Sequence, residues 1–137
     1  MMKPAGKRFA IDAPTALRII RDDPGIGSRH RLVGPAVLRS HVLSLLYREM
    51  RGGAIEEKVA RAQLDGLATL QIRLLGDRVS RATAWKIAGQ LDWEDTALAE
   101  YLAVATLQAD AFIAADPTLQ AAAAEFTSVA DYATLRS

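Results

Sequence analysis

The chain has 137 residues, of which 50% are hydrophobic and 24% charged, and its formal net charge is +1. This length suits one domain with its own core, and we expect residues 1–137 to form it. The chain contains no cysteine, which excludes disulfides, thiolate zinc sites and a cysteine nucleophile. No apolar run is long enough for a signal peptide or a bilayer span, so the sequence predicts a cytoplasmic protein without membrane association.

The two ends of the sequence differ in charge. Residues 1–86 carry 16 of the 17 basic groups against 8 acids, whereas residues 87–137 carry one basic group against 8 acids. If the fold keeps these parts separate, a basic face would suit phosphate and an acidic face would suit a metal ion. If the fold intermixes them, the two fields cancel.

Short apolar runs and helical patterns follow one another along the chain. Strands are predicted over residues 8–11, 32–33, 72–75 and 111–114, with a final strand near 128–129. The residue patterns predict helices over 14–20, 36–51 and 55–70, then from the cap Asp77 to about 91, from Asp95 or Thr96 to 107, and shortly after Pro117. Unalternating strands between helices indicate a parallel sheet that is buried on both faces. The predicted fold is therefore a three-layer α/β/α domain.

Two aspartates follow predicted strands directly. Asp12 comes after residues 8–11, and Asp116 comes after the strand that begins at Ala111. Ligands of open parallel sheets bind beyond the carboxyl ends of the strands, where the strand order reverses. Each aspartate also precedes a helix that it could cap. Asp12 and Asp116 are the first candidates for a site.

Four segments in this order resemble the PIN-domain ribonucleases of the VapC toxin type. They are Ile11-Asp12-Ala13, Leu32 to Ser40, Asp95 to Ala103, and Phe112-Ile113-Ala114-Ala115-Asp116, and the resemblance extends from about residue 8 to 135. It implies a PIN-like fold and a ribonuclease that gathers three or four carboxylates around Mg²⁺ or Mn²⁺, which prefer oxygen ligands. It also implies RNA as substrate, an antitoxin protein as partner, and a homodimer.

Only two of the four acidic positions of that family are acidic here. Asp12 and Asp116 match, whereas His41 stands where the family has glutamate and Leu98 stands at the third aspartate position. Asp95 lies one helical turn before Leu98 and could serve as a metal ligand, although a helix cap is its simpler role. The predicted catalytic set is therefore Asp12, Asp116 and His41, and the predicted metal set is Asp12, Asp116 and Asp95.

His41 has several readings. Imidazole is a poor ligand for Mg²⁺, but it can ligate a transition metal, act as a general base, or contact phosphate when protonated. A partly buried histidine that is satisfied by a backbone carbonyl is an equally good reading. Glu100 lies about 200° around the helix from Leu98, which predicts that it points away from the site.

Other residues carry less weight. Trp85 and Trp93 are interpreted as core or interface aromatics. Arg39, Arg48 and Arg51 could contact RNA phosphate or an antitoxin, with solvated surface arginines as the simpler interpretation. His30 is given no role.

Three functions compete. The first is a metal-dependent endoribonuclease of toxin–antitoxin type with a reduced acidic site. The second is a PIN-like scaffold without catalysis that binds a protein or RNA partner. A phosphate-accepting receiver domain is a distant third, because receivers need an acidic pair after the first strand and Asp12 is followed by Ala13 and Pro14.

Overall fold

The fold is seen in a computed structural model that describes residues 7–136. A four-stranded parallel sheet in the order β3-β2-β1-β4 forms its centre. The strands are β1 (Arg8–Ile11), β2 (Arg31–Pro35), β3 (Ile72–Leu75) and β4 (Ala111–Ile113). This confirms the predicted three-layer α/β/α arrangement, and all four main predicted strands form.

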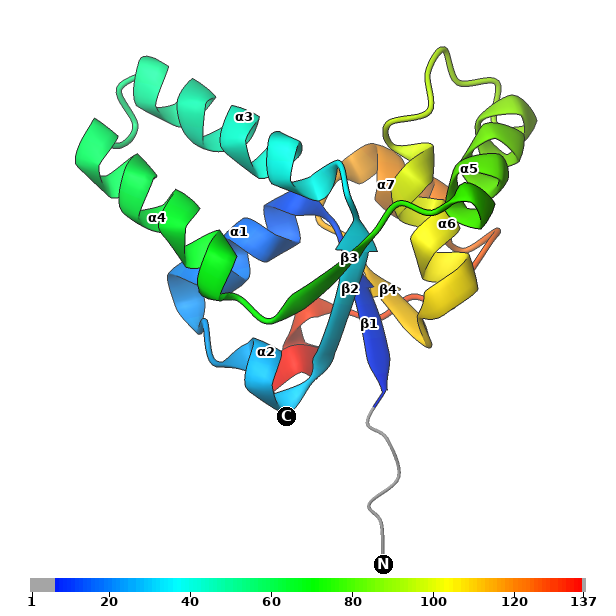
Figure 1. Ribbon diagram of the computed structural model, residues 1–137, viewed down its shortest axis with the longest axis horizontal. Coiled ribbons are helices and arrows are strands. Elements are labelled where there is room, and N and C mark those ends of the chain that lie inside the picture. Colours follow the sequence, from blue (N-terminus) through cyan, green and yellow to red (C-terminus); the bar gives the residue numbers. More distant parts are fainter. Residues whose placement is uncertain (1–6, 137) are drawn as a thin grey trace, which may run out of the picture.

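Helices cover both faces of the sheet (Figure 1). On one side lie α1 (Ala13–Asp22), α3 (Leu38–Arg51) and α4 (Glu57–Thr69), with the single turn α2 (Ile26–Arg29) below them in Figure 1. On the other side lie α5 (Arg78–Gln90), α6 (Ala99–Gln108) and α7 (Pro117–Ala123). A 3₁₀ helix over Tyr132–Arg136 ends the described chain. None of the described helices has the length and apolar character needed to cross a bilayer.

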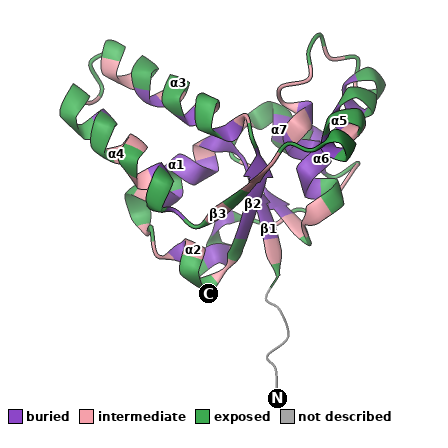
Figure 2. Cartoon of the chain, in the orientation of Figure 1, coloured by how far each residue is buried: buried purple, intermediate pink, exposed green. Residues whose placement is uncertain are grey.

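Burial follows the layers, because the strands have helices on both faces. Figure 2 shows buried residues along the sheet and on the inward sides of α1 and α6, and exposed residues on the outer faces of α3, α4 and α5. Six residues of the ten in α6 are buried, which makes α6 the most enclosed helix among the described elements. The one hydrophobic cluster of the described residues includes side chains from β1, β2, β4 and these helices.

Three sequence-based expectations need correction. The helix predicted from Asp95 or Thr96 begins only at Ala99, because the Asp95 carboxylate accepts a hydrogen bond from Ala97 N, two residues on, and so forms a turn. The segment between the predicted helix over 14–20 and the predicted strand over 32–33, for which no helix was expected, contains α2, and the fully buried Ile26 anchors this helix. The expected final strand is reduced to one bridge between Phe112 and Val129.

Candidate functional site

Asp12 and Asp116 meet at the carboxyl ends of β1 and β4, which are neighbours in the sheet. The chain leaves β1 toward β2 and β3 on one side and reaches β4 on the other, so this is the point where the strand order reverses. A cleft of about 270 Å³ lies there, which we call the strand-end cleft. It is lined by Asp12, Ala13, Pro14, His41, Ser44, Leu45, Arg48, Leu98, Tyr101, Asp116 and Leu119.

Asp12 is fully buried, and its own chain occupies both carboxylate oxygens. Oδ1 accepts hydrogen bonds from Thr15 N at 3.0 Å and Thr15 Oγ1 at 2.5 Å. Oδ2 accepts from Ala115 N at 2.9 Å and Asp116 N at 2.8 Å. A carboxylate has about four lone-pair positions, so these four bonds fill it. Asp12 therefore caps α1 and also ties the end of β4 to the end of β1.

The Asp116 carboxylate accepts fewer hydrogen bonds than that of Asp12. Its Oδ1 accepts a hydrogen bond from Leu119 N at 3.1 Å, which caps α7. Its side chain is half-buried and lines the strand-end cleft. Asp116 therefore has both predicted roles, as the cap of α7 and as a residue of the cleft. Its Oδ2 is the carboxylate oxygen left for a ligand.

His41 and Tyr101 form a pair on the wall of the cleft. His41 Nδ1 lies 2.7 Å from Tyr101 Oη, and the two rings stack with centroids 5.6 Å apart. Tyr101 is 1% exposed. Burial raises the pKa of Tyr101, and the negative charges of Asp12, Glu100 and Asp116 raise it further. Tyr101 is thus a neutral hydroxyl that fixes the histidine ring, a partner that the sequence reasoning missed.

Glu100 does not line the cleft, in agreement with its expected direction on the helix. Burial nevertheless raises the pKa of Glu100, and the positive charge of His41 offsets part of this rise. The two side chains are therefore within electrostatic reach of each other. Glu100 thus stays outside the cleft lining, as expected, but its charge interacts with that of His41.

The residues do not fit the divalent metal that the resemblance implies. Asp12 has no free lone pair, Leu98 adds only apolar surface, and Asp95 is exposed and absent from the cleft lining. Among residues 7–136 no group of three or more His, Asp or Glu side chains is arranged to hold a metal ion. The predicted metal set of Asp12, Asp116 and Asp95 is thus not assembled.

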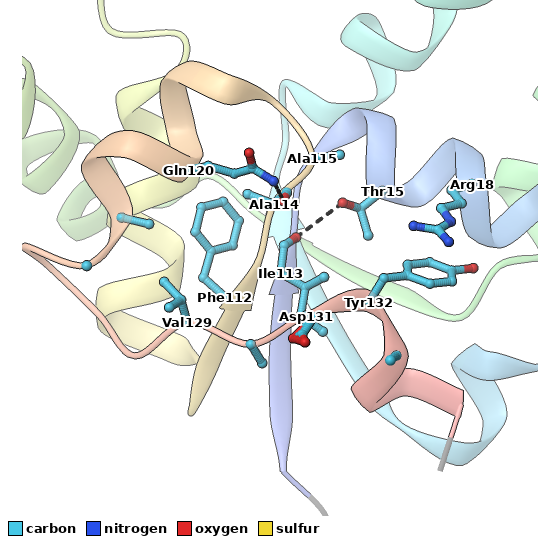
Figure 3. A pocket seen from close by; sticks show the side chains of 14 residues that line it. Thr15, Arg18, Phe112, Ile113, Ala114, Ala115, Gln120, Val129, Asp131 and Tyr132 are labelled. Carbon is cyan, nitrogen blue, oxygen red and sulfur yellow. Dashed lines mark hydrogen bonds between the residues drawn. The ribbon is translucent and has the colours of Figure 1, made fainter.

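A larger hollow of about 660 Å³ lies beside β4 on the other side of Thr15 (Figure 3). Figure 3 shows Phe112, Val129 and Tyr132 among its lining side chains. Thr15 Oγ1 contacts Ile113 O at 3.3 Å from this side and Asp12 Oδ1 from the other, so Thr15 separates the two cavities. The larger hollow is lined mainly by apolar side chains together with Arg18, Asp131 and Tyr132, whereas the two strand-end aspartates and His41 line the strand-end cleft.

Comparison with known proteins supports the fold and gives no information on activity. No model of a known protein family matches the chain, and no characterised protein matches it. The chain is similar to the crystal structure of PAE2754 from Pyrobaculum aerophilum, with a TM-score of 0.71 and 18% sequence identity. The match covers 95% of this chain and 94% of that one. At this identity the likeness shows a shared α/β fold over nearly the full length.

The hydrogen bonds of Asp12 predict a structural role for this residue that Asp116 does not share. Asp12→Asn replaces one acceptor oxygen by an amide that cannot accept, so buried donors lose their partner, and we expect a loss of about 2–4 kcal/mol in the free energy of unfolding. Asp116→Asn is the matched control, because asparagine caps a helix about as well as aspartate, and it should change stability by less than about 0.5 kcal/mol. Urea denaturation measures both, and equal losses would contradict the assignment.

Carboxylates introduced at positions 41 and 98 should supply the oxygen ligands that a divalent metal ion does not find in the wild type. We expect the double variant His41→Glu/Leu98→Asp to bind Mn²⁺, because it adds two oxygen ligands beside Asp116. Isothermal titration calorimetry should show saturable binding for this variant and none for the wild type. The uncharged variant His41→Gln/Leu98→Asn controls for shape. Saturable Mn²⁺ binding by the wild type would show that Asp12 can give up its hydrogen bonds.

Proposed function

We propose that the protein is a PIN-type domain that binds single-stranded RNA across the carboxyl edge of its sheet without a resident metal ion. The observation that carries the proposal is the pair of basic helices beside that edge. Figure 1 shows α3 and α5 on opposite sides of the carboxyl ends of the strands. An RNA strand that lies over the strand-end cleft would pass between them.

Helix α3 presents cations along its exposed side. It contains Arg39, Arg48 and Arg51, all of them exposed, and Arg48 also lines the strand-end cleft. Its single acid, Glu49, is paired with Arg21 of α1. The arginines of α3 are thus available for phosphate, whose geometry suits the guanidinium fork.

Helix α5 presents a similar surface. Arg78, Arg81 and Lys86 are exposed, and no acidic residue lies within the helix. Trp85 stands next to Lys86 with 78% of its surface exposed, which contradicts its interpretation as a core residue, although the interface interpretation stays untested. Trp93, by contrast, packs against the core. An exposed tryptophan among cations suits the stacking of an unpaired base.

The same combination occurs on α3, where Tyr47 is 56% exposed beside Arg48. Proteins that bind single strands combine a basic track for the backbone with aromatic rings for the bases. Helix α5 carries both components, and Arg48 of α3 lines the strand-end cleft together with His41, whereas Tyr47 lines a groove toward α4. These observations favour RNA over a small anion, and a cytoplasmic location belongs to the same proposal.

Metal-dependent cleavage by Asp12, Asp116 and His41 is the weaker form of the proposal. It requires Mg²⁺ or Mn²⁺ at carboxylate oxygens, and the four hydrogen bonds at Asp12 leave Asp116 as the main oxygen ligand. The reduced acidic site therefore supports the binding of RNA better than its hydrolysis through a metal.

Removal of the exposed ring on α5 tests the RNA surface. Trp85→Ala should weaken binding of a single-stranded RNA oligonucleotide by about 1–3 kcal/mol, since each stacked base contributes about that much. Fluorescence anisotropy at two salt concentrations measures it, and Lys86→Gln should reduce the salt dependence. Val129→Ala, at an exposed apolar residue that lines the hollow beside β4, is the control. Failure of the wild type to bind RNA at low salt would end the proposal.

A groove between α3 and α4 favours protein binding as a second candidate function. It has a volume of about 530 Å³ and is lined by Leu43, Leu46, Tyr47, Met50, Glu57, Ala60, Arg61, Leu64 and Asp65. Leu43 is 52% exposed there, on a surface that an apolar helix face would cover. The antitoxin and the homodimer implied by the resemblance are both candidates, and the second copy of the chain can be tested with the purified protein alone.

If the groove contacts a second copy, a charge in it should separate the subunits. We expect the wild type to sediment as a dimer and Leu43→Glu to sediment as a monomer, because an unpaired carboxylate would have to be buried in the interface. Val79→Glu on α5 is a control at an equally exposed valine. A wild type that stays monomeric at all concentrations would remove the second copy as the occupant.

A further inference from the structure

The amino-terminal end of the sheet carries a further cavity, opposite to the strand-end cleft. In Figure 1 this end of β1 and β2 lies beside α2, and the arrowheads of the two strands lie at the far end. The cavity has a volume of about 500 Å³, and we call it the amino-end hollow. Four arginines from β1, α2, β2 and β3 line it, namely Arg8, Arg29, Arg31 and Arg73.

The register of the sheet places three of these arginines on one face. Arg8 and Arg31 are partners across β1 and β2, so their Cα atoms lie about 4.8 Å apart. Arg73 is the partner of Val33 across β2 and β3. Val33 shares a face with Arg31, because the two are two residues apart along one strand. Three positive charges therefore start from the same face of neighbouring strands.

Nearby carboxylates offset part of this charge. Asp23 is ion-paired with Arg29 at 2.6 Å, which occupies the cation that α2 contributes. Asp110 lies beside Arg8, because its Oδ2 accepts a hydrogen bond from Arg8 N at 2.8 Å. Two of the four positive charges thus have an acidic neighbour.

Arg31 and Arg73 are the cations left for a ligand. Both are exposed, and neither takes part in an ion pair within residues 7–136. A guanidinium keeps its charge at any pH at which proteins fold, and its fork donates two parallel hydrogen bonds to a phosphate. Since Arg31 also stands next to Arg8, the like charges repel each other, and a bound anion would offset this repulsion.

The rest of the lining has the mixed character of a nucleotide site. Leu32 and Leu70 contribute apolar surface, and Gln71 and Gln108 contribute amide donors and acceptors. The volume lies within the range of pockets for small organic ligands, and a phosphate group alone would leave most of it unfilled. The leucines suit the flat face of a base, and the amides suit its polar edge.

We propose that the amino-end hollow binds a nucleotide through a terminal phosphate, with Arg31 and Arg73 as the residues that hold the phosphate. The ligand is a free nucleoside monophosphate or the 5′-phosphate end of an RNA chain, since both present the same phosphate monoester. The inference goes beyond the RNA surface proposed above and does not depend on it, because the two sites lie at opposite ends of the strands.

NMR spectroscopy of the full chain with adenosine 5′-monophosphate (AMP) tests the location. We expect saturable shifts at the backbone amides of Arg31, Gln71 and Arg73, and unchanged amides at Leu98 and Asp116 in the strand-end cleft. Adenosine and inorganic phosphate each supply one part of the ligand, and they should bind roughly 10-fold more weakly or less. Inorganic phosphate that binds as tightly as AMP would overturn the nucleotide assignment.

Two single substitutions test the residues. Arg31→Gln and Arg73→Gln should each weaken AMP binding by roughly 10- to 100-fold in calorimetry, the factor for a lost hydrogen bond to a charged group. Lys58→Gln is the matched control, because it removes one exposed positive charge that does not line the hollow. AMP should also raise the urea midpoint of the wild type and leave that of the folded double variant unchanged. Arginine variants that bind AMP like the wild type would overturn the proposal.

An RNA oligonucleotide with and without a 5′-phosphate separates the two sources of the ligand. If the RNA end is the ligand, the phosphorylated form binds more tightly than AMP and shifts the amides of the amino-end hollow. If a free nucleotide is the ligand, AMP binds more tightly. Absence of shifts in the hollow with both AMP and the phosphorylated RNA overturns the inference.

The same experiment keeps the inference apart from the proposed function. The form with a 5′-hydroxyl should bind the wild type and the Arg31→Gln/Arg73→Gln variant equally, because its site is the carboxyl edge of the sheet. If that form binds neither protein, the proposed function fails, while AMP shifts at Arg31 and Arg73 would still support the nucleotide site.

Discussion

The structure depends on one buried carboxylate. Asp12 joins the first strand–helix unit to the last one, because its two oxygens accept hydrogen bonds from Thr15 and from the backbone after β4. Hydrogen bonds to a charged acceptor are stronger than neutral ones, and a buried charge requires them. The favourable field at the start of α1 adds to the same effect. The neighbouring ends of β1 and β4 are held together by this residue.

This constraint determines what the cleft can do. A carboxylate that binds four donors cannot also give its oxygens to Mg²⁺, so the residue that the resemblance makes catalytic is structural here. Three groups remain in the cleft lining. They are His41, which contacts Tyr101, Asp116, whose Oδ2 is left for a ligand, and Arg48. They fit the proposed binding of a phosphodiester better than they fit the metal chemistry that the resemblance implies.

Much of the fold follows from local patterns in the sequence. Unalternating apolar runs such as residues 8–11 and 72–75 became parallel strands, and Asp12, Asp77 and Asp116 cap the helices that follow. The meeting of Asp12 and Asp116 was also predictable, because parallel strands end at the same edge of a sheet. These features depend on neighbours along the chain or on one general rule of topology.

The rest depends on contacts between distant residues. Whether Asp12 is free for a metal is decided by the amides of Ala115 and Asp116, about one hundred residues away, and no local pattern reveals them. The pairing of His41 with Tyr101 has the same origin. The exposure of Trp85 was missed because a tryptophan was expected in the core or at an interface, whereas the buried residues of its helix are Ser80, Ala84, Ile87 and Ala88.

The most direct test follows the side-chain carboxyl carbon of Asp12 and the amides of Ala115 and Asp116 by NMR while Mg²⁺ is added. The account predicts that the Asp12 signal stays unchanged and that both amides remain protected from hydrogen exchange up to the highest Mg²⁺ concentration added. A shift of the Asp12 carboxyl carbon together with loss of protection at the two amides would show that the carboxylate turns to the metal, and would contradict it.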